Sequence, residues 1–320
     1  MTWNLEWFYD NDDGDNYSKL AKEMSAKTRA QWDWKRDVVA TSIDMSRPSI
    51  IALQEIENRR VLFYLRQALQ REHQLDFQEI AVESGDFFTE QDVGFMYRGN
   101  RDVDAGGSNP LRIRPTSVVT YGMTEAMEND DALSNVSKHL AVQFEIKRGD
   151  DTELVTIVTL HLRAREEAVA VRTKQARTMH AWLAKKLKAG ENVIVLGDFN
   201  TEDTSWPATD GSDMSVVSGK ETSDESDDLV DLHAYLANNE RQTHLLPGKS
   251  FDRILVSPSL INDDPSRVDL VFTKIQQRKD LAIKGNVDVP QEHWDHYWDI
   301  DDNNRDISDH WPIMATFQWK

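Results

Sequence analysis

The interpretation of this sequence depends on the stretch Ile307-Ser308-Asp309-His310-Trp311-Pro312, which leads into an apolar run. Asp309 and His310 place a carboxylate next to an imidazole, directly before residues that are typical of a β-strand. Carboxylate oxygens bind hard divalent cations, and an imidazole can hydrogen-bond a phosphate oxygen. The motif therefore indicates an active site that this part of the chain completes.

Five other strand-like runs end in or next to polar residues that can bind metal or phosphate. Taken singly, each has an ordinary explanation, because a carboxylate after a strand is more often a helix cap or a loop residue. In layered α/β folds, however, strand ends that converge on one edge build the site. Six such motifs in order favour one active site over coincidence. The five runs are Trp3-Asn4-Leu5-Glu6, Ile51-Ala52-Leu53-Gln54-Glu55, Thr159-Leu160-His161-Leu162-Arg163, Val195-Leu196-Gly197-Asp198-Phe199-Asn200 and Phe251-Asp252-Arg253-Ile254-Leu255.

The string Gly197-Asp198-Phe199-Asn200 is more specific than a lone carboxylate. Asp198 and Asn200 are two residues apart, so on an extended backbone their side chains share a face and can grip one phosphate or metal. Gly197 permits a close approach of the backbone.

Apolar runs rich in β-branched residues alternate with helix-like stretches along the chain, which predicts an α/β fold built in layers. Loop insertions are expected at 201–231 and 285–306. The second contains aromatic residues that could form a wall for the substrate or pack onto the domain. The expected strands are 2–5, 49–53, 93–97, 140–146, 154–160, 193–196, 254–256 and 312–317, and the expected helices are 27–46, 59–71 and 166–189.

The chain is acidic and contains no cysteine. Its 320 residues carry a formal net charge of −19, which argues against a passive nucleic-acid binder because such proteins usually present a Lys/Arg surface. An enzyme escapes this objection, since a bound divalent metal supplies positive charge where the phosphate lies. The lack of cysteine excludes disulfides, thiolate metal sites and cysteine nucleophiles.

No apolar run approaches the roughly 18 residues that cross a bilayer. The beginning, Met1-Thr2-Trp3-Asn4, also lacks the basic and apolar regions of a signal peptide. We therefore expect no stable membrane association and a cytoplasmic protein by default, with a secreted protein trimmed of its signal peptide as the alternative. We infer no protein partner.

In these motifs the sequence resembles the endonuclease/exonuclease/phosphatase superfamily, whose members have the pancreatic-deoxyribonuclease-like fold. The resemblance spans nearly the whole chain, from Asn4 to His310. It implies a single domain over residues 1–320 with an α/β fold, a four-layered sandwich in which two mixed β-sheets face each other and are flanked by helices.

The resemblance also implies a metal site for Mg²⁺ or Mn²⁺. Glu55 and Asp309 are similar to the ligands of the principal cation, with Asn4 nearby as a ligand or a phosphate contact. Asp198 and Asn200 match the pair that orients the attacking water and holds the phosphate.

Two histidines match phosphate-facing residues of the family. His310 matches the imidazole that faces the scissile phosphate, and Asp252 matches the carboxylate that orients it. Because Asp252 should favour the imidazolium form of His310, we expect Asp198 to be the general base. His161 matches a second such histidine of the deoxyribonuclease-like branch, and we propose Asp92 as its carboxylate partner.

One departure from the family concerns phosphate binding. At the run 140–146 family members often carry an arginine that grips phosphate, whereas this chain has Lys138-His139. Arg163, two residues after His161, could substitute, since a guanidinium binds phosphate bidentately.

Fold and site do not fix the substrate of such an enzyme. The strings Gln54-Glu55-Ile56-Glu57-Asn58 and His161-Leu162-Arg163-Ala164 are similar to bacterial nuclease-type members, which predicts a nuclease with nucleic acid as its substrate. Asp252-Arg253-Ile254-Leu255 is similar to a motif of inositol-polyphosphate phosphatases, so the alternative is a phosphatase or phosphodiesterase acting on inositol phosphates or phospholipid head groups. A catalytically inactive binding module is a further alternative, which the presence of every expected acid and histidine disfavours.

Overall fold

Two six-stranded mixed β-sheets form the centre of the protein, in a computed structural model that describes residues 1–99, 111–119 and 138–320. The first sheet has the order β11 (Leu270–Gln277), β12 (Ile313–Trp319), β1 (Thr2–Phe8), β2 (Ile50–Ile56), β4 (Asp92–Arg98), β3 (Phe77–Val82). The second has the order β5 (Leu111–Val119), β6 (His139–Arg148), β7 (Asp151–His161), β8 (Asn192–Asp198), β10 (Asp252–Val256), β9 (Val230–Asp231).

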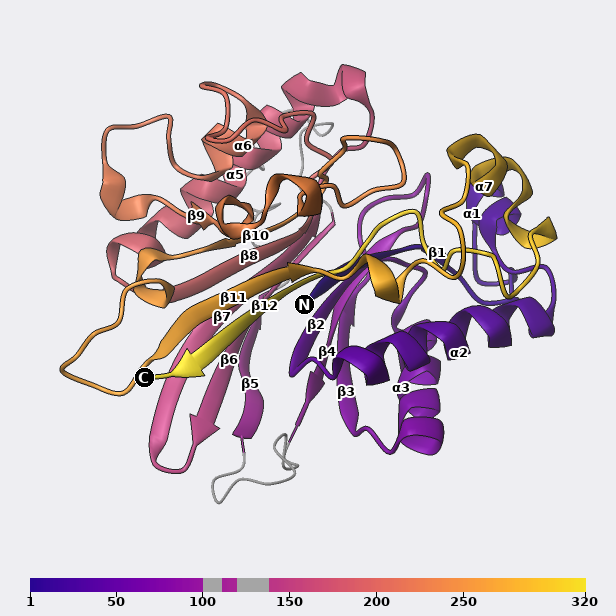
Figure 1. Cartoon of the computed structure of the whole chain (residues 1–320), viewed down its shortest axis with the longest axis horizontal. Coiled ribbons are helices and arrows are strands. Elements are labelled where there is room, and N and C mark those ends of the chain that lie inside the picture. Colours follow the sequence, from indigo (N-terminus) through magenta and orange to yellow (C-terminus); the bar gives the residue numbers. More distant parts are fainter. Residues whose placement is uncertain (100–110, 120–137) are drawn as a thin grey trace.

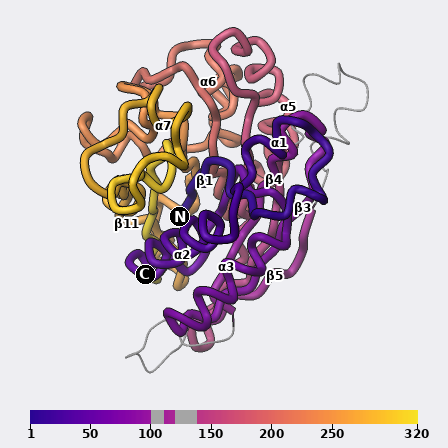
Figure 2. Tube along the Cα trace, turned by 90° about the vertical axis from the view of Figure 1, so that its right-hand side faces the viewer, coloured from indigo at the N-terminus to yellow at the C-terminus, as the bar shows by residue number. Residues whose placement is uncertain are grey.

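Helices cover the outer face of each sheet (Figure 1). α2 (Arg29–Ser46) and α3 (Arg59–His73) pack on the first sheet, and α5 (Val169–Lys188) packs on the second. A separate apolar core fills the space between the sheets. The ring centres of Phe95 and Phe144 lie 5.9 Å apart there. The view in Figure 2, turned by a right angle, shows α2 and α3 again on the β3 side of the molecule. The expected four-layered α/β sandwich is confirmed. The shorter helices are α1 (Lys19–Met24), α6 (Asp213–Val217) and α7 (Pro290–His296).

The long helices begin where the sequence supplies caps. The Thr28 hydroxyl accepts the N–H of Gln31, and the Gln31 side chain returns to the Thr28 N–H, which completes a capping box at the start of α2. The Asn58 side chain accepts two N–H groups at the start of α3.

Each strand and helix expected from the sequence is present, with bounds that shift by a few residues. The sequence analysis missed β3, β5, β9 and β11. β9 is only two residues long, and the outward-facing positions of the other three strands are largely polar. The two segments expected to be loop insertions, 201–231 and 285–306, contain the helices α6 and α7. Local sequence there lacks the long apolar stripe that would have predicted a helix.

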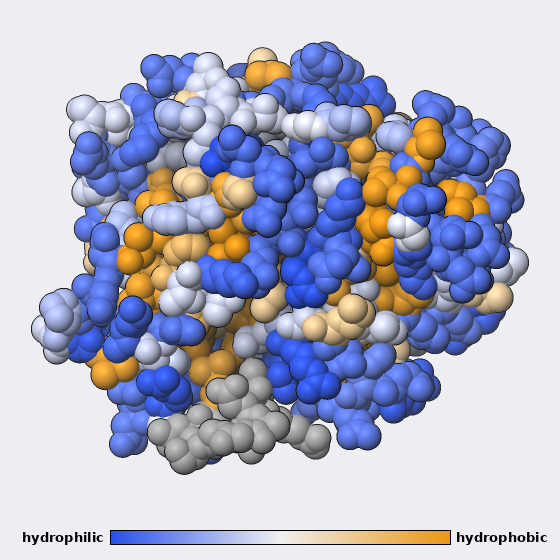
Figure 3. Space-filling model, viewed as in Figure 1, coloured by the Kyte–Doolittle hydropathy of each residue, from blue (hydrophilic) through white to orange (hydrophobic). Residues whose placement is uncertain are grey.

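Hydrophilic residues cover most of the face seen in Figure 3, as the charge of −19 leads one to expect. Hydrophobic residues show mainly in two places, over the strands at the left of the view and beside α2 and α7 at the right.

One opening lies at the edge of the two sheets. A cavity of about 570 Å³ opens there and is lined largely by apolar side chains of both sheets. Within the described part of the chain, no helix is long and apolar enough to cross a membrane.

Gly197 is the point of closest approach between β7 and β8. Its φ is +138°, and a Cβ atom added there would lie 2.1 Å from the carbonyl oxygen of Leu160, its partner across the parallel pair. The backbone of Asp198 can therefore approach β7 only because residue 197 has no side chain.

We expect Gly197→Ala to destabilise the fold by more than about 3 kcal/mol, because it combines a strained φ with a clash against backbone. Gly190→Ala is the matched control: Gly190 also has a positive φ, +71°, but open space around its Cβ position, so it should cost about 1 kcal/mol. Urea unfolding of both variants measures the difference. Equal losses would show that the contact with Leu160 is unimportant.

Candidate active site

Irregular backbone in the first sheet turns two polar side chains toward the site. In β2, Glu55 is an extra residue between Gln54 and Ile56, which pair with consecutive residues of β4. The register between β1 and β2 also shifts beyond Asn4. Glu55 and Glu6 have φ values of +57° and +48°, a left-handed conformation that costs energy for a residue with a side chain. Such bulges redirect side chains and are frequent beside active sites.

The second sheet contributes three functional groups from adjacent strands. His161 ends β7, Asp198 ends β8 and Asp252 begins β10. The register pairs His161 with Asp198, and Asp198 with Asp252, so the three residues lie in a row across the sheet. All three are buried. Parallel pairing of β7 with β8 thus brings together motifs that are far apart in the sequence.

The segment before β12 is tied to β1 by Ser308. Its hydroxyl donates to the Asn4 carbonyl at 2.8 Å and accepts the N–H of His310 at 3.0 Å. The indole of Trp3 donates to the carbonyl of His310 at 3.0 Å. These contacts place the imidazole of His310 between the two sheets.

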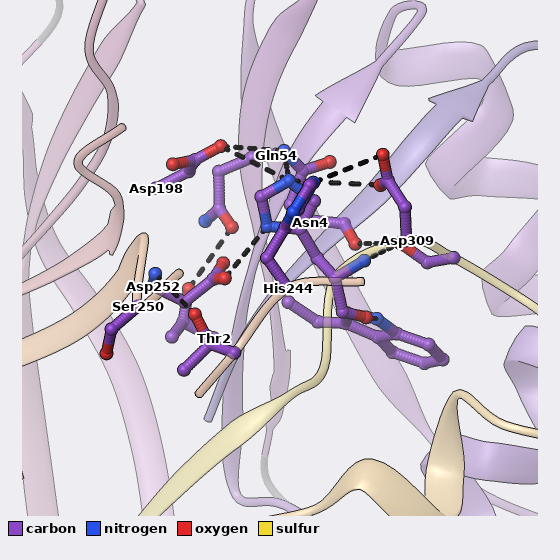
Figure 4. Close-up of polar contacts among 12 residues, drawn as sticks. Thr2, Asn4, Gln54, Asp198, His244, Ser250, Asp252 and Asp309 are labelled. Atoms are coloured by element: carbon purple, nitrogen blue, oxygen red, sulfur yellow. Dashed lines mark hydrogen bonds and ion pairs between the residues drawn. The ribbon is translucent and has the colours of Figure 1, made fainter. Parts of the chain in front are cut away.

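The side-chain amide of Asn4 lies at the centre of the cluster (Figure 4). Its Nδ2 donates to Asp198 Oδ2 at 2.9 Å and to Glu55 Oε1 at 3.1 Å, and lies 3.5 Å from His310 Nε2. Its Oδ1 accepts the N–H of Glu6 at 2.9 Å, which fixes the orientation of the amide. Asn4 therefore presents N–H groups to the site, and of its two expected roles this geometry suits a phosphate contact better than metal ligation.

The two histidines of the cluster have opposite protonation states. His310 Nδ1 lies 2.8 Å from Asp252 Oδ2. Burial acts to lower the pKa of His310, but Asp252, Asp198 and Asp309 outweigh it and hold the pKa well above its usual value. Burial lowers the pKa of His161 to about 3, with the charge of Lys138 adding to the effect. At neutral pH the site therefore contains one imidazolium and one neutral imidazole.

Asp198 lies between these two rings. Its Oδ2 is 3.5 Å from His161 Nε2 and 3.7 Å from His310 Nε2, and its Oδ1 accepts the N–H of Asn200 at 2.8 Å. Asn200 itself donates from its side chain to the Leu162 carbonyl at 3.1 Å. Oδ2 of Asp198 is thus directed toward the centre of the cluster, whereas the Asn200 side chain is held by the Leu162 carbonyl and only its backbone contacts Asp198.

The proposed pairing of His161 with Asp92 is wrong in this structure. Asp92 accepts the N–H of Ser84 at 2.7 Å, and His161 Nδ1 has no hydrogen-bond partner among the described residues. Asp92 begins β4 in the first sheet, opposite Ile56, whereas His161 ends β7 in the second sheet.

Arg163 lies at the rim of the site. Its side chain is exposed, whereas its backbone is fixed: its N–H donates to Gln175 at 3.0 Å and its carbonyl accepts from Arg172 at 3.0 Å. Lys138 is engaged elsewhere, in an ion pair with Asp86 at 2.7 Å. Arg163 is therefore available to a substrate that extends past the cluster.

The sequence analysis missed two side chains of the site. His244 Nε2 lies 3.4 Å from Asp309 Oδ2, and the indole of Trp294 donates to the same oxygen at 2.9 Å. Trp294 belongs to the aromatic segment 285–306, for which the sequence left open a substrate wall or packing onto the domain. Nothing in the sequence around His244 distinguishes it, because it reaches the site through an isolated bridge with His310.

The donors of the cluster suit a divalent cation. Four buried or nearly buried carboxylates, those of Glu55, Asp198, Asp252 and Asp309, surround one imidazolium. Burial raises the pKa of Glu55 to about 7, and the negative charge of Asp309 adds to it. A hard cation would relieve this excess of negative charge, and carboxylate oxygens are its preferred ligands. Two groups have the spacing to hold a metal: Glu55 with His161 and Asp198, and His244 with Asp309 and His310.

Solved structures similar to this one share its fold across nearly the whole chain. A humanized D. rerio TDP2 is 14% identical, with 99% of this chain and 97% of that chain covered and a TM-score of 0.56. The human nocturnin catalytic domain is 16% identical, with 90% and 87% covered and a TM-score of 0.55. A mannosyl-6-phosphatase of Bacteroides thetaiotaomicron is also 16% identical, with 99% and 98% covered and a TM-score of 0.55.

No curated protein matches the chain in sequence. A family model does: the one described as the endonuclease/exonuclease/phosphatase family matches residues 1–310, which include every motif of the cluster. The extent of this match and the shared fold show that the chain belongs to the endonuclease/exonuclease/phosphatase family, a family of phosphoester hydrolases.

Proposed function

We propose that this protein is a divalent-metal-dependent phosphodiesterase that cleaves nucleic acid. The observation that carries the proposal is the convergence of Asp198, His310 and the Asn4 amide on one point between the sheets. A carboxylate that can accept a proton there lies beside N–H groups that can bind phosphate oxygens.

The charge of the cluster favours a diester over a monoester. A phosphate monoester carries close to two negative charges at neutral pH, whereas each diester of a nucleic acid carries one. Among the described residues, no Lys or Arg forms an ion pair with Glu55, Asp198, Asp252 or Asp309. The positive charge of one imidazolium and of a cation bound by the carboxylates matches the single negative charge of a diester better than the charge of a monoester.

The motif that resembles inositol-polyphosphate phosphatases contributes no positive side chain to the site. The Arg253 guanidinium is buried, pairs with Asp231 at 3.2 Å and stacks 4.5 Å from the ring centre of Trp206. Neighbouring side chains on a strand point to opposite faces, so Arg253 is directed away from the side on which Asp252 holds His310. Arg253 therefore stabilises the fold around β10. It does not supply the positive charge that would favour a highly charged inositol phosphate as the substrate.

In the proposed mechanism, Asp198 Oδ2 takes a proton from the water that attacks phosphorus. The imidazolium of His310, oriented by Asp252, hydrogen-bonds a phosphoryl oxygen and donates a proton to the oxygen that leaves as the phosphorus–oxygen bond breaks. The amide N–H of Asn4 and the neutral ring of His161 position the phosphate. Glu55 and Asp309 would hold a divalent cation, which would supply charge neutralisation at the phosphate oxygens.

Arg163 supports nucleic acid as the substrate, because a polymer has further phosphates beyond the one that is cleaved. An exposed guanidinium on a fixed backbone, two residues from His161, can contact a neighbouring phosphate.

We expect the purified protein to hydrolyse single- or double-stranded DNA, RNA or bis(p-nitrophenyl) phosphate at low salt. EDTA should abolish the activity and Mg²⁺ or Mn²⁺ should restore it, because the carboxylate cluster needs a cation to accept phosphate. The panel also contains p-nitrophenyl phosphate, sphingomyelin and inositol phosphates. Hydrolysis confined to monoesters would contradict the diester proposal, and a protein inactive on the whole panel with metal would be a binding module.

Asp198→Asn should lower kcat for DNA and for the diester reporter by about 10²–10⁴-fold, since an amide cannot accept the proton of the attacking water. Circular dichroism and the unfolding midpoint should stay near those of the wild type. Asp224→Asn, at an exposed carboxylate in the segment 201–231, is the matched control and should leave kcat unchanged. A rate for Asp198→Asn within a factor of three of wild type would remove Asp198 from the mechanism.

Arg163→Ala should raise KM for DNA and lower the slope of log KM against log salt concentration by about 1, the loss of one phosphate contact. KM for bis(p-nitrophenyl) phosphate should change little. The reason is that Arg163 lies outside the cluster and contacts only a flanking phosphate. Lys185→Ala, at an exposed position of α5, serves as the control for loss of a positive charge. Equal effects of Arg163→Ala on the two substrates would contradict a role in binding the polymer.

A further inference from the structure

The helix α7 reaches the active site from outside both sheets. In Figure 1 it lies beyond the end of β1, away from the body of the sandwich. Its Trp294 donates an indole N–H to Asp309 Oδ2 at 2.9 Å, although 39% of the residue is exposed. A surface residue of a short helix thus contacts a buried carboxylate of the cluster.

His244 lies beside the same carboxylate oxygen. Its Nδ1 accepts the backbone N–H of Leu246 at 3.0 Å, which leaves the proton on Nε2, and Nε2 lies 3.4 Å from Asp309 Oδ2. The His244 ring stacks on Trp294 with 6.2 Å between ring centres and packs edge-on against His310 at 4.6 Å. Trp294 and His244 therefore approach the same oxygen of Asp309, and their rings pack against each other.

The other carboxylate oxygen points the opposite way. Oδ1 of Asp309 lies 3.8 Å from His310 Nε2, on the side of the cluster. Because Oδ2 accepts from Trp294 and faces His244 Nε2, Oδ1 is the oxygen left for a cation. Burial acts to raise the pKa of Asp309, but His310 and His244 outweigh it and hold the pKa well below its usual value.

A buried histidine fastens α7 in place. His293 Nε2 lies 2.7 Å from Glu6 Oε2 and its Nδ1 lies 2.8 Å from Asp288 Oδ2. The same oxygen of Glu6 accepts the backbone N–H of Asp309 at 3.0 Å. Burial acts to lower the pKa of His293, but Glu6 and Asp288 raise it to about 9, so the ring is charged at neutral pH. One carboxylate, Glu6, thereby holds both α7 and the backbone of Asp309.

We propose that Trp294 and His244 are positioning residues that fix the rotamer of Asp309, so that its Oδ1 is presented to the catalytic cation. The inference rests on the metal dependence proposed above. Partners that hydrogen-bond a metal ligand orient it, and their loss typically lowers metal affinity by about 10–100-fold.

The test measures Mn²⁺ affinity by isothermal titration calorimetry, with no substrate present. Trp294→Phe keeps an aromatic ring but loses the N–H, and we expect its Kd for Mn²⁺ to rise by about tenfold or more. Trp298→Phe is the matched control, because Trp298 lies in the same segment as Trp294 but its ring packs against Trp34 and Tyr297. Its Kd should stay within a factor of two of wild type. The Mn²⁺ electron paramagnetic resonance spectrum should change in Trp294→Phe alone.

His244 provides a second, independent variant pair. Glutamine can place an N–H close to the position of Nε2, so His244→Gln should retain more Mn²⁺ affinity than His244→Phe, which has no donor. Hydrogen exchange over 290–299 and the unfolding midpoint establish whether each variant keeps α7 in place. Equal affinity losses in the two His244 variants, or an unchanged Kd in a folded Trp294→Phe, would overturn the inference.

Failure of the inference differs from failure of the proposed function. A wild-type protein that binds Mn²⁺ with an affinity that depends on Trp294, yet cleaves no phosphoester, would support the positioning role and contradict the enzyme. An active wild type whose Kd and kcat are unaffected by Trp294→Phe would contradict only the positioning role.

Discussion

Burial of four carboxylates around one imidazolium is the constraint on which the rest of the site depends. Burying an unpaired charge costs several kcal/mol, so each carboxylate needs a partner in the folded state. Asp252 pairs with His310, Asp198 accepts from Asn4 and Asn200, and Glu55 accepts from Asn4 and the Trp7 backbone. The negative charge that these contacts leave uncompensated is what a divalent cation would neutralise.

The same constraint accounts for the irregular backbone of β1 and β2. Regular pairing would place alternate side chains on opposite faces, with no means of turning several polar groups to one point. The extra residue at Glu55 and the left-handed conformations of Glu6 and Glu55 allow Asn4, Glu55 and Glu6 to serve the site together. We attribute the conformational cost of these residues to that arrangement, in which Glu6 links the Asp309 backbone to His293.

The sequence predicted the parts of the site that lie at strand ends. Asn4, Glu55, His161, Asp198, Asp252 and His310 lie in or next to strands of the two facing sheets and meet between them, and their strand-like runs are visible in the sequence. His244 and Trp294 reach Asp309 from a turn and a short helix, whose positions depend on long-range packing. The error at Asp92 has a similar origin, because the sequence does not show which residues of the two sheets meet.

The charge of the site limits the substrate more than the fold does. TDP2, nocturnin and the mannosyl-6-phosphatase share this architecture, and a shared fold alone does not fix a substrate. Here the cations that could bind a second phosphate charge are used elsewhere: Lys138 pairs with Asp86 and Arg253 with Asp231. In a chain of net charge −19, attraction of a polyanion from a distance is weak. If nucleic acid is the substrate, as we propose, recognition would rest on a few local contacts, of which the cation held by Glu55 and Asp309, His310 and Arg163 would be the positive ones.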